Sequence, residues 1–389
     1  CRISCFSIVK MIMDHLKEAL TRLENKGRLR SLSSAQGVDF TSNDYLGFAT
    51  HPELVKAGEL FFSQGGAVGS AASRLLHGYM DEHFQLEAYA ADYFEAPASL
   101  FFSTGFQANM ALMSALAQRG DAIIFDSLIH ASSRDGIQAS LAKHYRAAHN
   151  DLNAYEEALK KAREAVKGQL WVAVEAVYSM DGDDAPLDEL YTLCQHYGAT
   201  LIIDEAHGVG VCGATGKGVS EALVKTHGYD GIICVHTCGK ALGAAGGLVC
   251  ASKSVIEYLV NTARGFIYTT APMPIQAHMV RCALELLQTP QGQRQRQKLF
   301  SNCAALKTHL GGLGSHIVPV VIGEDQCAVN ISDFMRDRGY DVRAIRPPTV
   351  PHGSARLRVS LNADLSVEEI NGFCDALSEA RSVIEGKAA

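Results

Sequence analysis

Short apolar segments separated by helix-forming segments recur through the middle of the chain, and this alternation constrains the fold more than any other feature. The apolar segments lie at residues 100–102, 122–125, 170–174, 200–203, 232–235 and 248–250, and residues 144–146 are a weaker candidate strand. Helical patterns stand between them, as at residues 151–166 and 187–197. Strands that alternate with helices in this way form a mostly parallel sheet whose two faces are covered by helices. The sequence therefore predicts an α/β fold.

Pro272 and Pro274 interrupt this alternation, and a helical pattern at residues 275–287 and a polar stretch at 291–298 follow. The rest of the chain favours two strands and two helices, at residues 317–322, 357–361, 327–339 and 367–384. At the other end, leucines with helical spacing predict a helix over residues 14–30. We therefore expect three parts: an N-terminal helix and arm at 1–50, a large α/β domain at 51–285, and a smaller α+β C-terminal domain at 286–389.

Composition excludes several classes of protein. The 389 residues are 47% hydrophobic, as in ordinary globular proteins, and the net charge of −7 predicts no basic surface for nucleic acid. No apolar run is long enough to span a membrane, and residues 1–10 do not have the pattern of a secretory signal peptide. The odd number of eleven cysteines, most of them in apolar runs, favours reduced buried thiols over a disulfide framework. We expect a cytoplasmic protein whose natural start is Met11 or Met13.

Polar residues and a glycine follow five successive apolar segments. In open α/β sheets, ligands bind just beyond the carboxyl ends of the strands. The residues at these places are Gly105, His130, Ser179, Asp204 with His207, and Thr237 with Lys240. Their recurrence predicts one ligand site at this edge of the sheet.

Lys240 is surrounded by small residues, from Gly239 to Gly247. Small residues let a bulky group come close to the backbone, and a lysine amine that is removed from water becomes a nucleophile. The same stretch is also typical of a surface lysine in a glycine-rich loop, so it does not decide the matter alone.

Asp204 ends an apolar segment, where an isolated carboxylate would be costly. It therefore needs a cationic partner from the protein or from a ligand. Together with His207 it could ligate a metal, although no third ligand is evident nearby. Gly105 opens a helix after a strand, and the amides of a helix N-terminus favour an anion such as phosphate.

The sequence does not match three other ligand-binding motifs. Residues 213–218 look like a phosphate-binding P-loop but have Val211 and Gly218 where that motif needs Gly and Ser or Thr. Residues 180–184 lack the ligand alternation of a calcium-binding EF-hand loop. The first strand is not followed by Gly-x-Gly-x-x-Gly, which disfavours a nicotinamide-dinucleotide enzyme.

One ligand would use all the residues at the strand ends. Pyridoxal phosphate (PLP) needs a lysine for its aldehyde, an acid for its ring nitrogen and donors for its phosphate. Lys240, Asp204 and Gly105 supply these groups. The ring nitrogen, when protonated, would also pair the buried carboxylate of Asp204.

Four motifs resemble those of the α-oxoamine synthases, which are fold-type I PLP enzymes that join an amino acid to an acyl thioester with loss of CO2. They are Ser-Asn-Asp-Tyr-Leu-Gly at 42–47, Ser-Met-Asp-Gly-Asp at 179–183, Asp-Glu-Ala-His-Gly at 204–208 and Thr-Cys-Gly-Lys-Ala-Leu-Gly at 237–243. The resemblance extends over residues 14–380 and implies a fold-type I PLP-dependent transferase.

The resemblance also implies roles for residues of the site. Lys240 would bind the cofactor aldehyde covalently, Asp204 would pair the ring nitrogen, His207 would contact the ring hydroxyl and His130 would stack on the ring. Other residues would lie at the cofactor and its phosphate, namely Gly105, Phe106, Ser179 and Thr237. The residues implied to lie toward the substrates are Arg30, Asn43, His130, Arg346 and Thr349. Arg346 would hold a carboxylate.

The substrates follow from the same resemblance. Residues 344–351 and 355–358 favour the branch that condenses L-alanine with a pimeloyl thioester, carried on coenzyme A or on an acyl carrier protein. The alternatives are the branch that uses glycine and acetyl-CoA, and a non-catalytic protein of the same fold. Residues 268–270 resemble a segment that reaches a neighbouring subunit, which implies a homodimer. Cys238 and residues 70–73 depart from the family pattern and leave the acyl-chain preference open.

Overall fold

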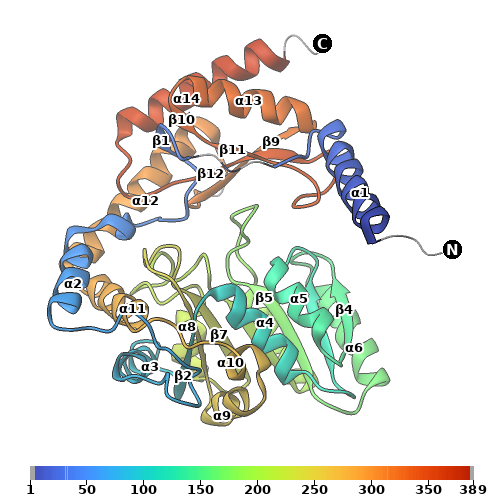
Figure 1. Ribbon diagram of the computed structural model, residues 1–389, viewed down its shortest axis with the longest axis vertical. Coiled ribbons are helices and arrows are strands. Elements are labelled where there is room, and N and C mark those ends of the chain that lie inside the picture. The colour runs from blue at the N-terminus through green and yellow to red at the C-terminus, as the bar shows by residue number, and fades with distance from the viewer. Residues whose placement is uncertain (1–4, 31, 33, 313, 386–389) are drawn as a thin grey trace. The chain divides into compact units, whose positions relative to one another are not determined.

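The computed structural model describes residues 5–30, 32, 34–312 and 314–385 (Figure 1). Residues 1–4, part of the segment judged not to be a signal peptide, lie outside the described residues. The chain divides into two compact units. The larger unit is Ser42–Ile317 with Leu361–Asp364, and the smaller unit is Cys1–Thr41, Val318–Ser360 and Leu365–Ala389. The three-part division at residues 50 and 285 stays a prediction.

The larger unit contains a seven-stranded sheet with the strand order β2-β8-β7-β6-β5-β3-β4. The strands are β2 (Ala98–Phe102), β3 (Ala122–Asp126), β4 (Lys143–Ala147), β5 (Leu170–Glu175), β6 (Ala199–Asp204), β7 (Ile232–Thr237) and β8 (Gly247–Ala251). β8 is antiparallel to β2 and β7, and the pairs from β7 through β6, β5 and β3 to β4 are parallel. The predicted, mostly parallel sheet is therefore confirmed.

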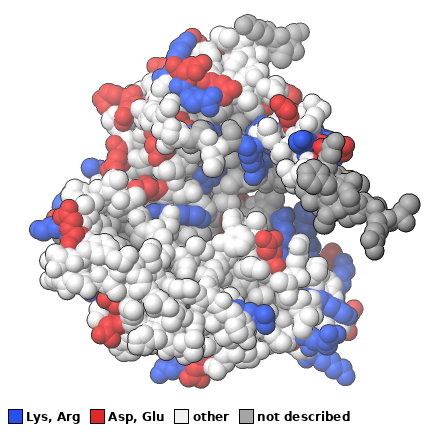
Figure 2. All heavy atoms as spheres, viewed as in Figure 1, with Lys and Arg blue, Asp and Glu red and all other residues white. Residues whose placement is uncertain are grey.

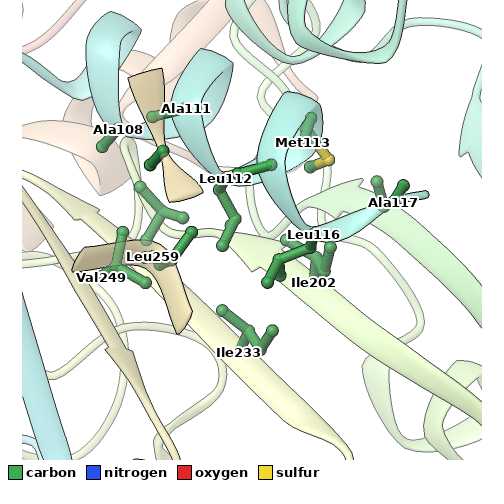
Figure 3. Packing of buried hydrophobic residues seen from close by; sticks show 14 of the residues in the cluster. Ala108, Ala111, Leu112, Met113, Leu116, Ala117, Ile202, Ile233, Val249 and Leu259 are labelled. Atoms are coloured by element: carbon green, nitrogen blue, oxygen red, sulfur yellow. The ribbon is translucent and has the colours of Figure 1, made fainter. Parts of the chain in front are cut away.

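Helices cover both faces of this sheet because its inner strands are apolar on both sides. On one face, α4 (Gly105–Leu116) packs with α5 (Ala131–Ala139), α9 (Lys253–Thr262) and α10 (Arg264–Ile267). Figure 3 shows Leu112 and Leu116 of α4 directed toward Ile202 and Ile233 of the strands. Burying such a side chain stabilises the fold by about 1.5–3 kcal/mol. We call this cluster the α4 core.

The other face is covered by α3 (Asp81–Tyr93), α6 (Leu152–Ala165) and α7 (Leu187–Tyr197). The remaining helices of the larger unit are α2 (Pro52–Ser63), α8 (Glu221–His227), α11 (Pro274–Leu287) and α12 (Pro290–Leu310). α2, α11 and α12 begin with proline, which is suited to the first turn because the amide there has no partner inside the helix. α7 ends at Gly198, which has the left-handed conformation (φ 61°) that glycine adopts without strain.

The smaller unit is α+β, as expected of the C-terminal part. Its sheet has the order β11-β12-β9, with β9 (Ile317–Gly323), β11 (Arg343–Ile345) and β12 (Ala355–Ser360), and Ile317 itself belongs to the larger unit. The helices are α1 (Cys5–Asn25), α13 (Asp325–Asp337) and α14 (Val367–Glu385). β1 (Val38–Asp39) pairs in parallel with β10 (Tyr340–Asp341), which brings the N-terminal arm into this unit.

The surface carries charges of both signs. On the face drawn in Figure 2, Lys and Arg side chains are mixed with those of Asp and Glu, in keeping with the net charge of −7. No helix among the described residues is long and apolar enough to cross a membrane.

His236 on β7 is an exception to the rule that buried polar groups are paired. Its ring stacks on Phe94 with centroids 3.7 Å apart, and neither ring nitrogen has a hydrogen-bond partner among the described residues. Burial lowers the pKa of His236 to about 3. By contrast, the equally buried His83 accepts a hydrogen bond from the Met80 amide and donates one to the Pro272 carbonyl.

We predict that His236→Phe makes the protein more resistant to acid and leaves it at least as stable at neutral pH. In the unfolded chain His236 takes up a proton below about pH 6.5, but in the fold it does so only near pH 3, so stability falls as pH drops through that range. Phenylalanine keeps the stack and removes this dependence. The measurement is the denaturation midpoint at neutral and mildly acidic pH.

The matched control is His83→Phe, which breaks two buried hydrogen bonds and should cost about 1–3 kcal/mol at neutral pH. An acid-induced loss of stability in His236→Phe equal to that of the wild type would contradict the prediction.

Candidate active site

The side chains of the last residues of β5, β6 and β7 project from the same face of the sheet. Each follows by two positions a residue of the α4 core, and side chains two apart on a strand share a face. These last residues are Glu175, Asp204 and Thr237. The strand ends therefore direct two carboxyl groups and a hydroxyl group toward the N-terminal half of α4.

Asp204 is 5% exposed, and both of its carboxylate oxygens accept hydrogen bonds. Oδ2 accepts from Nδ2 of Asn109 at 2.6 Å, and Oδ1 accepts from the amide of Ala206 at 3.0 Å. A carboxylate that accepts two hydrogen bonds has further acceptor capacity for a ligand. The expected cationic partner therefore has a place to bind.

Lys240 lies in the connection between β7 and β8, and its amine is 2.8 Å from Nε2 of His207. On the other side of the ring, Nδ1 of His207 is 2.6 Å from the hydroxyl of Tyr45, which donates to Oδ1 of Asn43 at 2.9 Å. Since the tyrosine proton is used on Asn43, the Tyr45 oxygen accepts from His207 Nδ1. His207 then accepts from Lys240 through Nε2, so this row of bonds defines one tautomer of His207.

His130 caps the N-terminus of α5, and its Nδ1 accepts hydrogen bonds from the Ser132 amide at 3.2 Å and from the Ser132 hydroxyl at 2.8 Å. Asn109 donates to the same hydroxyl at 3.1 Å, so Asn109 links Asp204 to His130. Burial lowers the pKa of His130, the charge of Asp204 opposes this, and the charge of Lys240 adds to it. His130 is thus a neutral ring with its proton on Nε2.

The N-terminus of α4 packs directly on Thr237. A methyl group on Gly105 would lie 2.2 Å from Oγ1 of Thr237, so only glycine allows this approach. Thr104 caps the helix by accepting from the Gln107 amide, which leaves the first amides, including that of the half-exposed Phe106, for an anion. Two predicted phosphate-binding positions, Gly105 and Thr237, are therefore in contact.

Ser179 lies in the loop after β5, and its amide donates to Oε2 of Glu175 at 3.2 Å. The far end of this loop is held by His149, whose ring nitrogens contact Oδ1 of Asp126 at 2.9 Å and Oδ2 of Asp183 at 2.8 Å. Burial lowers the pKa of His149, but the bonds to the two carboxylates outweigh it and raise the pKa to about 10. His149 is a cation that fastens the Ser179 loop to the end of β3.

The predicted substrate residues fall in both units. Asn43 is in the larger unit, whereas Arg30, Arg346 and Thr349 are in the smaller unit. There, Nη2 of Arg30 lies 3.5 Å from Oγ1 of Thr349, and Arg346 donates to the carbonyl of Gly27. Arg30, Arg346 and Thr349 line a cavity of about 850 Å³ in the smaller unit, together with leucines of α1.

The loop that resembles a P-loop is occupied by the protein's own side chains. Glu221 accepts hydrogen bonds from the amides of Thr215 and Lys217, and Arg296 donates to the carbonyls of Val211 and Gly213. A carboxylate thus takes the position that a phosphate would need. Within the ranges that the structure describes, no three His, Cys, Asp or Glu side chains are arranged to hold a metal ion.

Several residues of the site were not singled out from the sequence. Asn109 and Ser132 stand inside helical patterns, and Tyr45 stands in a turn, where such residues are common. Glu175 did leave a signal, because it ends an apolar run just as Asp204 does.

We predict that Asn109→Ala lowers the free energy of unfolding by about 1–3 kcal/mol, because it leaves a buried carboxylate oxygen without its donor. Ser132→Ala removes the bonds of the Ser132 hydroxyl to His130 and Asn109 but keeps the bond from Asn109 to Asp204, so it should cost less. Denaturant titration of both variants at neutral pH provides the comparison. Equal losses would show that the bond from Asn109 to Asp204 contributes nothing of its own.

We also predict that His149→Gln lowers the melting temperature in a pH-dependent way. The folded pKa of about 10 lies above the ordinary 6.5, so the contribution of His149 is complete below about pH 6.5 and is lost as pH rises through about 10. The difference in melting temperature between wild type and variant should shrink over that range. His144→Gln, on the exposed edge strand β4, is the control and should show no such trend.

Comparison with known proteins identifies the family. The model of the aminotransferase class I and II family matches residues 35–377. An 8-amino-7-oxononanoate synthase from Saccharophagus degradans is 41% identical over 359 residues, which are 90% of this chain and 88% of that protein. Seven further proteins of that name, from other organisms, are between 38% and 41% identical to the chain.

Solved structures share the fold. An 8-amino-7-oxononanoate synthase from Francisella tularensis has a TM-score of 0.74 at 28% identity, with 91% of this chain and 99% of that chain covered. A serine palmitoyltransferase from S. paucimobilis with a bound PLP–myriocin aldimine has a TM-score of 0.86 at 27% identity, with 97% and 99% covered. The resemblance to the α-oxoamine synthases and the fold-type I architecture are thus confirmed. The chain belongs to the aminotransferase class I and II family and, within it, to the 8-amino-7-oxononanoate synthases.

Proposed function

We propose that the chain is a PLP-dependent acyltransferase of biotin biosynthesis. It condenses L-alanine with a pimeloyl thioester and releases 8-amino-7-oxononanoate, CO2 and the thiol carrier. The observation that carries the proposal is the convergence of Lys240, His207 and Asp204 at the strand ends, with the Lys240 amine 2.8 Å from His207. The curated relatives of that name support the choice of substrates.

The residues present fit pyridoxal 5′-phosphate. Lys240 provides the amine, the buried Asp204 provides an anion for the ring nitrogen, and the N-terminus of α4 against Thr237 provides donors for the phosphate. When bound, the cofactor supplies an aldehyde that joins amines and a ring that withdraws electrons from the neighbouring carbon. Ser179 and Phe106 complete the proposed cofactor contacts, and His130 covers the ring.

The residues of the chain would then bind and move protons. Lys240 would take the proton from the Cα atom of alanine and later return one to the product. Asp204 would hold the proton on the ring nitrogen, because its carboxylate is fixed in place by the donors of Asn109 and Ala206. His207 accepts from Lys240 through Nε2 and so orients the lysine amine.

The substrate contacts are part of the proposal. Arg346 would pair with a substrate carboxylate, since its planar guanidinium suits two parallel hydrogen bonds. Arg30 and Thr349 lie beside each other in the cavity of the smaller unit, and Asn43 holds Tyr45 of the larger unit. The chemistry of Arg30 and its neighbours suits a negatively charged acyl donor, on coenzyme A or on an acyl carrier protein.

The decisive experiment is reduction with borohydride in the presence of PLP, followed by peptide mapping. The expected result is a single modified residue, Lys240, with the absorbance of a lysine-bound cofactor before reduction. Lys240→Arg, which keeps the charge but cannot form the bond, is the control and should stay unmodified. Modification at another lysine would overturn the proposed anchor.

Turnover of paired substrates tests the reaction. We expect alanine with pimeloyl thioester to give product at least tenfold faster than glycine with acetyl-CoA, which is a difference of about 1.4 kcal/mol in the barrier. The release of thiol measures both pairs in one assay. A preference for glycine and acetyl-CoA would assign the chain to the other branch of the α-oxoamine synthases.

We further predict that Gly105→Ala weakens PLP binding at least tenfold, because the new methyl group would displace Thr237 from the N-terminus of α4. The dissociation constant follows from titration of the cofactor-free protein. Gly58→Ala in α2 is the control, since its methyl group would make only an ordinary contact with Met279. An unchanged constant in Gly105→Ala would remove this helix terminus from the cofactor site.

We also propose a homodimer located in the cytoplasm. In the larger unit the side chain of Leu76 is 83% exposed, and those of Val68 and Tyr268 are also well exposed. Exposed apolar surface of this kind marks a place where another protein binds. Light scattering should give twice the mass of one chain. Leu76→Asp should shift the protein toward the monomer, and a wild-type protein that is monomeric at micromolar concentration would refute the dimer.

A further inference from the structure

Glu175 is a buried carboxyl group that the proposed mechanism does not use. It is the last residue of β5 and 2% exposed. Oε2 accepts one hydrogen bond, from the Ser179 amide at 3.2 Å, whereas Oε1 is buried and has no partner among the described residues. An ionised carboxylate with so little solvation is costly, but a neutral carboxylic acid is much less so.

A second carboxyl group lies beside it. Glu175 and Asp204 are register partners on the parallel strands β5 and β6, and both point to the face of the sheet that α4 covers. Two carboxyl groups so close in a buried site do not both ionise, because the second charge would face the first without water between them.

The hydrogen bonds decide which of the two keeps the proton. Both oxygens of Asp204 have donors, at 2.6 Å and 3.0 Å, whereas Glu175 has a single longer bond. The negative charge therefore belongs on Asp204 and the proton on Glu175. Burial first, and then the charge of Asp204, raise the pKa of Glu175 to about 8, with Lys240 opposing the shift and Asp126 at the end of β3 adding to it.

We propose that Glu175 is a positioning residue that works as a neutral acid. It keeps a proton beside Asp204, so that the pair carries one negative charge, and its Oε2 holds the Ser179 loop at the site. The part of the proposal that concerns the cofactor rests on the proposed function, whereas the protonation of Glu175 in the cofactor-free protein does not. Ionisation of Glu175 would place a second charge next to Asp204 and so favour protonated forms of the bound cofactor.

The first test uses the cofactor-free protein and Glu175→Gln, which keeps the shape of the neutral acid but cannot ionise. Because the folded pKa of about 8 lies above the ordinary 4.5, the contribution of Glu175 to stability is complete below about pH 4.5 and is lost as pH rises through about 8. The wild type should therefore lose melting temperature relative to the variant over this range. Parallel curves would overturn the proposal.

The second test uses the protein with PLP bound and follows the absorbance of the lysine-bound cofactor against pH. The wild type should show an inflection near pH 8 that Glu175→Gln lacks. Glu205→Gln is the matched control, because burial raises the pKa of Glu205 as well, to about 7, but its carboxylate accepts from the amides of Val219 and Ser220 and not from the Ser179 loop. The Glu205→Gln variant should have altered stability but should keep the inflection, as expected if Glu205 has only a structural role.

An inflection that persists in Glu175→Gln, or one that disappears in Glu205→Gln, would overturn the role of Glu175 toward the cofactor. Failure to bind PLP at all would instead refute the proposed function and leave the first test valid. If Glu175→Gln does not fold, infrared spectroscopy of the cofactor-free Glu205→Gln variant replaces it, because burial also raises the pKa of Glu205, to about 7. The band of a protonated carboxyl group should be present at neutral pH and disappear as pH rises through about 8, and its absence at neutral pH would overturn the proposal.

Discussion

The site depends on the way in which a carboxylate group is held at the end of a buried strand. Asp204 is held by the amide of Ala206 and by the side chain of Asn109, which comes from α4 across the face of the sheet. The α4 core fixes the distance between that helix and the strands, so ordinary apolar packing determines where the charge lies. Asn109 also donates to Ser132 and thereby sets the orientation of His130. The side chain of Asn109 therefore links the packing of α4 to the position of the Asp204 carboxylate and to the tautomer of His130.

Much of this arrangement can be predicted from the sequence. Most strands of the large sheet could be found because they are short apolar runs, whereas the edge strand β4 is polar and gives a weaker signal. The site could be placed because a polar residue ends several of the apolar runs. What the sequence does not show are contacts between residues far apart in the chain. Asn109 is 95 positions from Asp204, and Tyr45 is 162 positions from His207. The pairing of β1 with β10 is equally non-local, and it places the N-terminal arm in the smaller unit.

Several buried or half-buried charged groups in the larger unit lie against a group of opposite charge. His149 joins the carboxylates of Asp126 and Asp183, whereas Arg74 lies against Glu87 with 2.7 Å between nitrogen and oxygen. Buried pairs of this kind define geometry more than they add stability, because the loss of hydration offsets much of the attraction. The loop that bears Ser179 thus has a fixed shape at both ends, from Glu175 and from His149.

The contact of Gly105 with Thr237 extends to a third position. A methyl group on Gly247 would lie 2.8 Å from the Cα atom of Gly105, so helix α4 and strands β7 and β8 meet where no further atom fits. A larger residue at either glycine requires the neighbouring element to move first. A single substitution at either glycine therefore changes the packing of a helix against two strands, and not only the volume of one side chain.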